Sequence, residues 1–126
     1  MLGMPGDFTP PSRFVRAVAF TNAANPVETA AEGVNLAHHV LSSFDLFPGL
    51  VRGEGEEKKY PELTQWATFS DMKNRAYYFR SYQDPSIRKV DLQALRFDDD
   101  KVLVIPMHTD RPSYQDVTGR ARILTR

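Results

Sequence analysis

Residues 14–20, Phe-Val-Arg-Ala-Val-Ala-Phe, form the apolar run that most constrains how this chain folds. Wound as a helix, the run presents apolar side chains in nearly every direction, with Arg16 as its exception. A helix without a continuous polar side is typical of one surrounded by protein. The sequence therefore predicts a helix that other parts of the fold cover on most sides.

The residues around this run predict where the helix begins and ends. Gly6 tolerates backbone angles that are closed to other residues, and Thr9 can cap a helix with its hydroxyl group. Pro10 suits the first helical position because its missing N–H would be unpaired there. We therefore expect a turn that leads into a helix starting near Pro10. The helix should end within 22–26, Asn-Ala-Ala-Asn-Pro, since asparagine favours turns and a residue before proline avoids helical angles.

Two arginines, Arg13 and Arg16, conflict with an apolar environment. A guanidinium group stays protonated, and burying it without a partner costs several kcal/mol, on the order of the whole stability of a small domain. In one interpretation both side chains lie at the rim of the helix and reach into water, with Asp7 as a partner. In the other, at least one of them meets a carboxylate or opens onto a functional site.

A second helix is predicted after the break. Thr29 and Glu32 have the spacing of a capping box, and a start at Asn25, with Pro26 and a reciprocal Glu28, is the alternative. Residues 45–48 should end this helix. Helical spacing defines its buried stripe, which consists of Val34, Ala37, His38, Leu41 and Phe44.

Strands are predicted in the second half of the chain. The ranges 64–70 and 76–82 are rich in aromatic and β-branched residues, and the polar residues 71–74 between them have hairpin length. Both strands are apolar on two faces, which places them between covering layers, as in a sandwich of sheets flanked by helices. The shorter elements expected are a charged loop at 49–60, a strand at 87–90, a helical turn at 91–95, a turn at 97–101 and a strand at 102–105.

The composition excludes several classes of function. The 126 residues carry 16 basic and 16 acidic side chains, so no net charge attracts nucleic acid or anionic lipid, and we expect neither nucleic acid nor a membrane as a partner. No segment approaches the ~20 apolar residues that span a bilayer, and no export signal is visible. The chain has no cysteine, which excludes disulfides, thiolate metal sites and thiol nucleophiles within it.

Several residues resemble functional motifs, but an ordinary structural role explains each of them better. His38 and His39 are adjacent on a helix, so their side chains point about 100° apart and cannot share one metal ion. The acidic run 98–100 lacks the alternating spacing of a calcium loop and is expected to be a solvated turn. The aromatic and basic stretch 75–80 has no positive field around it and is expected to be a packed strand.

Three serines, Ser12, Ser42 and Ser43, have no neighbouring base in the sequence pattern, so we do not expect them to be nucleophiles. We therefore expect no metal and no cofactor.

Five blocks, in the same order, resemble the choloylglycine hydrolases, a family that includes penicillin V acylases and bile salt hydrolases. The first is Gly-Met-Pro-Gly-Asp-Phe-Thr-Pro-Pro-Ser-Arg-Phe-Val-Arg-Ala at 3–17, which matches the family pattern G-h-P-G-D-x-[ST]-x-x-S-R-F-V-R-A, where h is apolar. Further blocks lie at 32–41, 64–66, 77–82 and 87–92. Five ordered blocks are far more specific than one short motif.

The resemblance implies an α+β fold, part of the four-layer αββα sandwich of the N-terminal-nucleophile (Ntn) hydrolases, with antiparallel strands covered by helices. It also implies hydrolysis of linear amide C–N bonds in small molecules such as penicillin V or conjugated bile acids. The nucleophile in that family is a cysteine exposed as the first residue of the mature chain, and this sequence has none. We interpret residues 3–107 as the C-terminal portion of such a domain, a fragment, and 108–126 as a polar tail.

Arg13 is the residue to which the resemblance assigns a catalytic role. It matches the first arginine of the family's S-R-F-V-R motif, which lies beside the nucleophilic cysteine, whereas Arg16 is expected to make structural contacts. A nearby cation favours the thiolate over the thiol and offsets the charge of the tetrahedral intermediate. The segment alone is expected to be inactive because it lacks the nucleophile.

The resemblance also implies partners. We expect a small-molecule amide substrate, the missing N-terminal portion of the same domain, and a homo-oligomeric complete enzyme. A second hypothesis, from a different class, is a non-catalytic module that keeps the family scaffold for binding or assembly.

Overall fold

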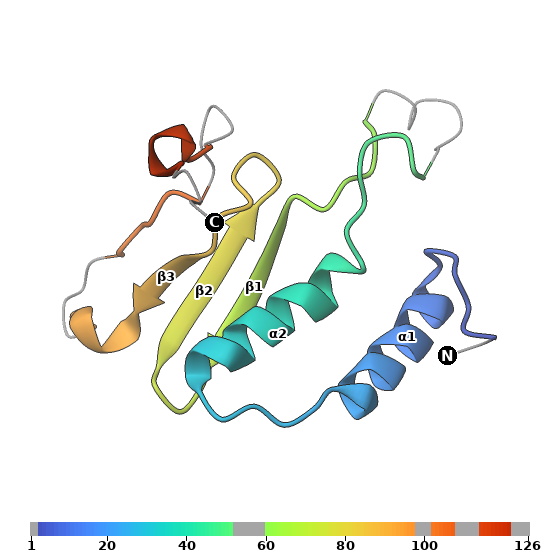
Figure 1. Ribbon diagram of the computed structural model, residues 1–126, viewed down its shortest axis with the longest axis horizontal. Coiled ribbons are helices and arrows are strands. Elements are labelled where there is room, and N and C mark those ends of the chain that lie inside the picture. The colour runs from blue at the N-terminus through green and yellow to red at the C-terminus, as the bar shows by residue number, and fades with distance from the viewer. Residues whose placement is uncertain (1–2, 52–59, 98–101, 108–113, 122–126) are drawn as a thin grey trace, which may run out of the picture.

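The computed structural model describes residues 3–51, 60–97, 102–107 and 114–121 (Figure 1). Two helices in these ranges precede three strands, and neither helix has the length and apolar character needed to cross a bilayer. The elements are α1 (Pro10–Ala23), α2 (Ala30–Ser42), β1 (Trp66–Asp71), β2 (Ala76–Ser81), β3 (Arg88–Asp91) and the short 3-10 turns η2 (Leu92–Ala94) and η3 (Thr118–Arg120).

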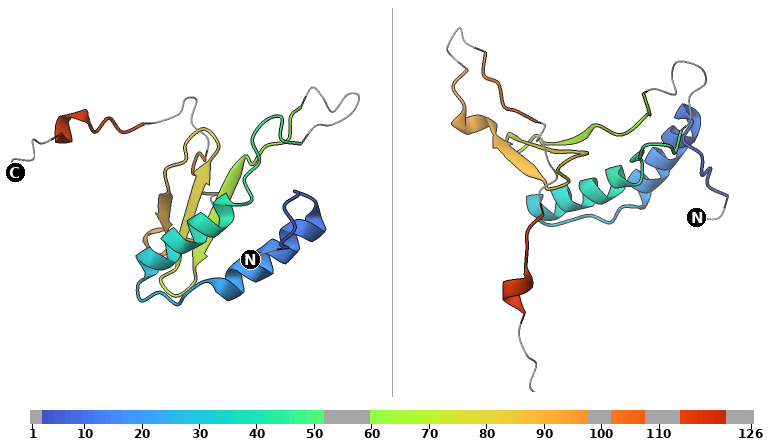
Figure 2. Two further views of the ribbon diagram at one scale, coloured as in Figure 1. Left: turned by 45° about the vertical axis from the view of Figure 1, so that its right-hand side comes forward. Right: turned by 90° about the horizontal axis from the view of Figure 1, so that it is seen from above.

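The strands form one antiparallel sheet in the order β1-β2-β3. Helix α2 lies across one face of this sheet, and α1 lies beside α2 (Figure 1). Residues 102–107 run on the opposite side of the sheet from α2 (Figure 2). The predicted α+β class with antiparallel strands is therefore confirmed.

The hairpin of β1 and β2 is the one that the sequence predicts. The ladder ends where Asp71 pairs with Ala76, and the Asp71 carboxylate accepts hydrogen bonds from the Asn74 backbone N–H at 3.0 Å and the Asn74 side-chain amide at 2.7 Å. Arg75 closes the turn with a φ of +52°, in the left-handed region. These local bonds fix the register of the two strands.

The two faces of the sheet are covered by different means. Alternation along β2 directs Arg80 toward α2 and Phe79 toward the opposite face. On that opposite face, the Arg88 guanidinium lies 4.5 Å from the centre of the Phe79 ring and donates a hydrogen bond to the Met107 carbonyl at 2.8 Å. Covering layers were expected on both faces, and the helix supplies one of them. The apolar side chains buried in the described part are Phe69, Ala76 and Phe79.

Helix α1 begins at Pro10, as predicted, but other elements do not cover it on most sides. Phe14 is 70% exposed, and the ring of Phe20 packs against that of Phe44, in the segment after α2, with the ring centres 5.9 Å apart. The expectation of a helix surrounded by protein is therefore wrong for the described residues, because α2 packs on one side of α1 and leaves its apolar outer side open.

The strand predicted at 102–105 is absent from the described structure. Val102 is 88% exposed and Val104 is 80% exposed, and neither belongs to a strand. A short apolar run forms a strand only where a neighbouring edge pairs with it, and the sequence pattern carries no information about that edge. Most of the loop predicted at 49–60 and of the turn at 97–101 lies outside the described residues. The boundary between 3–107 and 108–126 stays a prediction.

Helix α2 begins with the capping box predicted at Thr29. The Thr29 hydroxyl accepts the Glu32 backbone N–H at 3.2 Å, and the Glu32 carboxylate accepts the Thr29 backbone N–H at 2.9 Å. The alternative start at Asn25 is not used. The helix ends at Ser42, before the range 45–48 in which its end was expected.

We predict that Thr29→Ala lowers the free energy of unfolding by about 1 kcal/mol, because the Glu32 N–H loses its acceptor at the helix start. Glu28→Gln is the matched control, since Glu28 contributes its backbone N–H to the same cap and the substitution keeps that group. Urea unfolding followed by far-ultraviolet circular dichroism measures both variants. Equal stability of the two variants would contradict the assigned cap.

Candidate functional site

The turn before α1 is built around the carboxylate of Asp7. One oxygen accepts the Thr9 backbone N–H at 2.9 Å and the Thr9 hydroxyl, and the other accepts the Ser12 hydroxyl at 2.7 Å. The prediction that the Thr9 hydroxyl caps α1 is wrong: Thr9 occupies the N-cap position, but its hydroxyl accepts no N–H of the helix and donates to Asp7. Asp7 thereby ties the turn to the first residues of the helix.

These bonds set the charge of Asp7. The Thr9 hydroxyl first, and then the Ser12 hydroxyl, lower the pKa of the Asp7 carboxyl from its usual 3.8 to about 2, because hydrogen bonds to a carboxylate favour its charged form. At neutral pH the side chain is an anion close to the start of a helix, where the helix dipole also favours negative charge. The turn is thus held by a permanent charge rather than by a neutral group.

Arg13 lies in the first turn of α1, directly after this anchor. Its backbone N–H donates to the Thr9 carbonyl at 3.0 Å, and its side chain is exposed. Within the described ranges the guanidinium group takes part in no hydrogen bond and no ion pair. Asp7 does not pair with it, and the Asp7 oxygens bind Thr9 and Ser12 instead. The guanidinium group therefore keeps all its donors for a ligand or a further segment.

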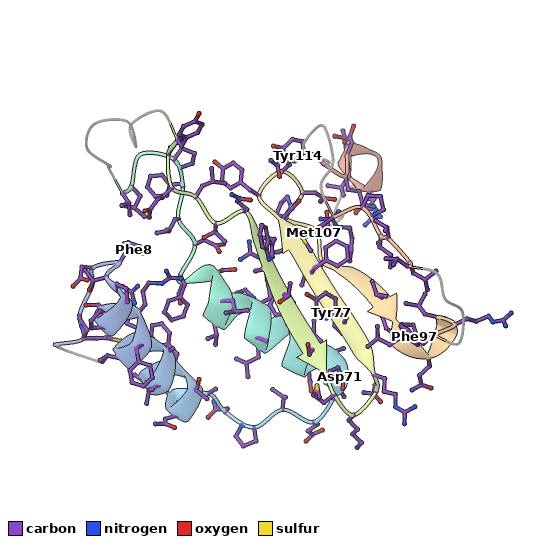
Figure 3. All side chains as sticks on the ribbon, turned by 180° about the vertical axis from the view of Figure 1, so that it is seen from behind. Phe8, Asp71, Tyr77, Phe97, Met107 and Tyr114 are labelled. Atoms are coloured by element: carbon purple, nitrogen blue, oxygen red, sulfur yellow. The ribbon has the colours of Figure 1, made fainter. Side chains whose placement is uncertain are left out.

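Arg16, one turn along the same helix, has the opposite environment. The residue is 8% exposed, and its guanidinium carbon lies 5.1 Å from the centre of the Phe8 ring and 5.4 Å from that of Phe44. Phe8 lies near the start of α1, on the side of the segment that follows α2 (Figure 3). The Nε and Nη2 atoms are buried without a hydrogen-bond partner among the described residues. Arg16 therefore joins α1 to the segment after α2 through aromatic faces. The interpretation in which it reaches into water is wrong, and the structural contacts expected of Arg16 are the ones observed.

A second buried guanidinium joins the sheet to α2. Arg80 is 6% exposed, and its Nη2 donates to the Asp45 carboxylate at 2.6 Å and lies 3.4 Å from the Ser42 hydroxyl. Burial, and then the charge of Arg80, lower the pKa of His38. The His38 ring packs edge-on against Phe69 at 6.1 Å, so this histidine is part of the packing between α2 and the sheet.

The sequence analysis did not predict the ion pairs of Arg80 with Asp45 and of Arg88 with Asp84. The stretch 75–80 was expected to be a packed strand, which β2 confirms, but no spacing signals a pair between Arg80 and Asp45, which are 35 residues apart. Arg88 and Asp84 are four residues apart and lie at 3.8 Å, so their spacing did offer a signal. Within the ranges that the structure describes, no group of three histidine, aspartate or glutamate side chains is placed to hold a metal ion.

The comparison with protein families decides what this scaffold belongs to. The family described as linear amide C-N hydrolases, choloylglycine hydrolase family, matches residues 1–105, which include α1, α2 and the whole sheet. The chain belongs to the choloylglycine hydrolase family. The predicted resemblance is therefore confirmed, and members of this family hydrolyse linear amide C–N bonds in small molecules.

Individual relatives agree with this assignment. The chain is 33% identical over 114 residues to a bile salt hydrolase/transferase of Lactiplantibacillus plantarum, which covers 90% of this chain and 34% of that protein. It is 34% identical over 107 residues to a bile salt hydrolase/transferase of Bifidobacterium longum, which covers 83% of this chain and 32% of that protein. The chain thus spans about a third of the length of these curated relatives.

Solved structures show the same fold. A variant of the conjugated bile acid hydrolase of Clostridium perfringens superposes with a TM-score of 0.73 at 26% identity, over 93% of this chain and 34% of that chain. The penicillin V acylase of Agrobacterium tumefaciens superposes with a TM-score of 0.60 at 26% identity, over 73% of this chain and 28% of that chain. The Ntn-type fold predicted from the resemblance is therefore confirmed.

The Asp7 turn gives a pH-dependent prediction. Because the pKa of Asp7 is lowered in the folded state, its contribution to stability is present above about 3.8 and is lost as the pH falls toward about 2. Asp7→Asn should therefore destabilise the chain at pH 6 and have little effect at pH 2. Urea unfolding at the two pH values measures this difference.

A direct control follows the carboxyl group itself. Ser12→Ala removes one donor to Asp7, so an NMR titration should show the pKa of Asp7 moving upward toward 3.8 in this variant. A value of 3.8 for Asp7 in the unsubstituted folded chain would contradict the assigned turn.

Proposed function

We propose that this chain is the C-terminal part of an Ntn amidase that hydrolyses linear amide C–N bonds in penicillin V-like or conjugated bile acid-like small molecules. The observation that carries the proposal is the exposed guanidinium of Arg13, which has no partner among the described residues and stands on a helix start held by Asp7. The names bile salt hydrolase/transferase, conjugated bile acid hydrolase and penicillin V acylase among the relatives support this substrate class.

The proposed reaction needs a nucleophile from outside this chain. A cysteine in the remaining portion of the domain attacks the amide carbonyl as a thiolate, and its own α-amino group serves as the base. The amine then leaves, and water hydrolyses the resulting thioester to the acid and the free thiol. Arg13 favours the thiolate and offsets the negative charge on the tetrahedral oxygen. A positive charge that is already in place costs no reorganisation during the reaction.

The described contacts distinguish the two arginines of the motif. Arg16 is covered by Phe8 and Phe44, so we assign it to holding α1 in place rather than to the reaction. Arg13 has no such cover, and we assign it to the active site.

The apolar side chains on the exposed outer side of α1 are an argument for a further segment of the same domain that covers them. Phe14 and Val15 are 70% and 48% exposed, and apolar side chains on one helix face are ordinarily covered in a complete fold. We propose that the N-terminal portion of the domain covers this side, that residues 3–107 belong to the domain with 108–126 as a polar tail, and that the complete enzyme is a homo-oligomer.

A non-catalytic module for binding or assembly is the second candidate function. Residues 1–105 match the family and contain no cysteine, which such a module does not need. The two candidates differ in what joining the chain to a nucleophile-bearing portion would do, since only the first predicts that amide hydrolysis appears.

We predict that these 126 residues alone hydrolyse neither penicillin V nor glycine-conjugated bile acids, because they contain no thiol. The measurement is release of the amine product by the purified chain. Turnover that scales with protein concentration and survives further purification would overturn the proposal.

A second prediction concerns Arg13 in a complete enzyme, for which the bile salt hydrolase/transferase of Lactiplantibacillus plantarum serves as the host. Replacing its matching arginine as Arg13→Ala should lower kcat/KM by about 10²–10³, the effect of losing one preorganised electrostatic contact. Arg13→Lys keeps the charge but loses the planar fork of donors, so it should recover only part of the loss.

The control is the arginine that matches Arg16 in the same host. Arg16→Ala should lower the melting temperature more than the activity of the folded fraction, because its contacts are structural. Full activity per folded molecule in Arg13→Ala would remove the proposed catalytic role.

A further inference from the structure

Helix α1 begins without the side-chain cap that ordinarily holds the first turn of a helix. Thr9 occupies the N-cap position, but its hydroxyl accepts no N–H of the helix. Pro10 and Pro11 follow, and proline has no N–H that a cap could bind. The first turn, which carries Arg13, therefore needs support from outside the helix.

The Asp7 carboxylate supports this turn by two routes that both lead to Arg13. It accepts the Ser12 hydroxyl at 2.7 Å, and Ser12 is the residue directly before Arg13. It also accepts the Thr9 backbone N–H at 2.9 Å, and the Thr9 carbonyl accepts the Arg13 N–H at 3.0 Å. The backbone of Arg13 is thus connected to Asp7 from both ends of the turn.

The environment of these bonds strengthens them. Ser12 is 8% exposed, so water competes little for its hydroxyl group. The Thr9 and Ser12 hydroxyls lower the pKa of Asp7 to about 2, so the acceptor is charged at neutral pH. Hydrogen bonds to a charged acceptor are about twice as strong as those between neutral groups. The turn is therefore more rigid than one held by a neutral cap.

The Arg13 side chain has no anchor of its own in the described ranges. It is exposed and takes part in no hydrogen bond and no ion pair there. The next side-chain contact of the motif is that of Arg16, one turn later, with Phe8 and Phe44 (Figure 3). Among the described residues, the backbone of the first turn therefore sets the position from which the Arg13 guanidinium group extends.

We propose that Asp7 is a positioning residue for the amidase reaction, whose carboxylate holds the first turn of α1 so that Arg13 reaches the nucleophile at the correct distance. This inference rests on the proposed function, since it needs the Arg13 guanidinium group in the active site. Catalytic groups have to be held within about 0.5 Å of their productive place, and a displacement of about 1 Å can cost about 10²-fold in rate. In this role Asp7 acts through Arg13 alone.

A double-mutant cycle tests this role in the complete bile salt hydrolase/transferase of Lactiplantibacillus plantarum, with substitutions at the matching positions. Asp7→Ala should lower kcat/KM per folded molecule by about 10–10²-fold. In the Arg13→Ala background the same substitution should have little further effect, because the group that Asp7 positions is already absent. Asp7→Asn keeps one acceptor oxygen, so it should recover part of the loss.

The pKa of the nucleophilic thiol separates positioning from a direct effect of the Asp7 charge. Removal of a nearby anion favours the thiolate and lowers the pKa of the thiol, whereas displacement of the Arg13 cation raises it. We expect Asp7→Ala to raise the thiol pKa, and not to raise it further in the Arg13→Ala background. Ser12→Ala removes one bond to Asp7 without a change of charge, so it should raise the thiol pKa by a smaller amount.

Arg16→Ala is the matched control, because it weakens the same helix by removing contacts with Phe8 and Phe44. It should lower the melting temperature and leave the thiol pKa unchanged. If Asp7→Ala does not fold, Asp7→Asn and Ser12→Ala provide the same comparison between the two backgrounds.

Two results would contradict the positioning role and leave the proposed function intact. One is an equal loss of kcat/KM from Asp7→Ala with and without Arg13, and the other is a thiol pKa that falls in Asp7→Ala. A different result, in which Arg13→Ala changes neither kcat/KM nor the thiol pKa, would overturn the proposed function and the positioning role together.

Discussion

Buried arginine side chains hold this structure together, because a guanidinium group that is removed from water needs a hydrogen-bond acceptor or an aromatic face to offset its lost hydration. Only three apolar side chains are buried in the described part, so contacts of this kind carry much of the packing. Each contact therefore constrains the relative positions of the elements that it joins. The three contacts are Arg16 with Phe8 and Phe44, Arg80 with Asp45, and Arg88 with Phe79 and the Met107 carbonyl.

Arg13 is informative because it departs from this rule. It stands three residues before Arg16 on the same helix, yet no side chain of the described part neutralises or covers it. Its position is set by the backbone of α1 and by the Asp7 carboxylate that holds the first turn. A site for a thiolate or an oxyanion requires a guanidinium group that is held in position by its backbone and is bound to no other side chain. The contrast between Arg13 and Arg16 within one motif is therefore the physical basis of the proposed function.

Local signals in the sequence were sufficient for the elements that local bonds determine. Pro10 gave the start of α1, Thr29 and Glu32 gave the cap of α2, and the polar connector after Asp71 gave the hairpin. The failures concern contacts that local spacing does not reveal. The Thr9 hydroxyl donates to Asp7 and accepts no N–H of the helix, the cover of Arg16 includes a ring 28 residues away, and the run 102–105 pairs with no strand of the described ranges. The role proposed for Arg13 rests on the family motif, and no spacing within these residues reveals it.

The central claim is that the guanidinium group of Arg13 stabilises a cysteine thiolate in the complete enzyme. The most direct measurement is the pKa of the nucleophilic cysteine in a full-length family member, followed by the ultraviolet absorbance of the thiolate, before and after the matching Arg13→Ala substitution. Loss of a neighbouring cation should raise the pKa of that thiol by about 1 or more. An unchanged thiol pKa in a correctly folded variant would contradict the account.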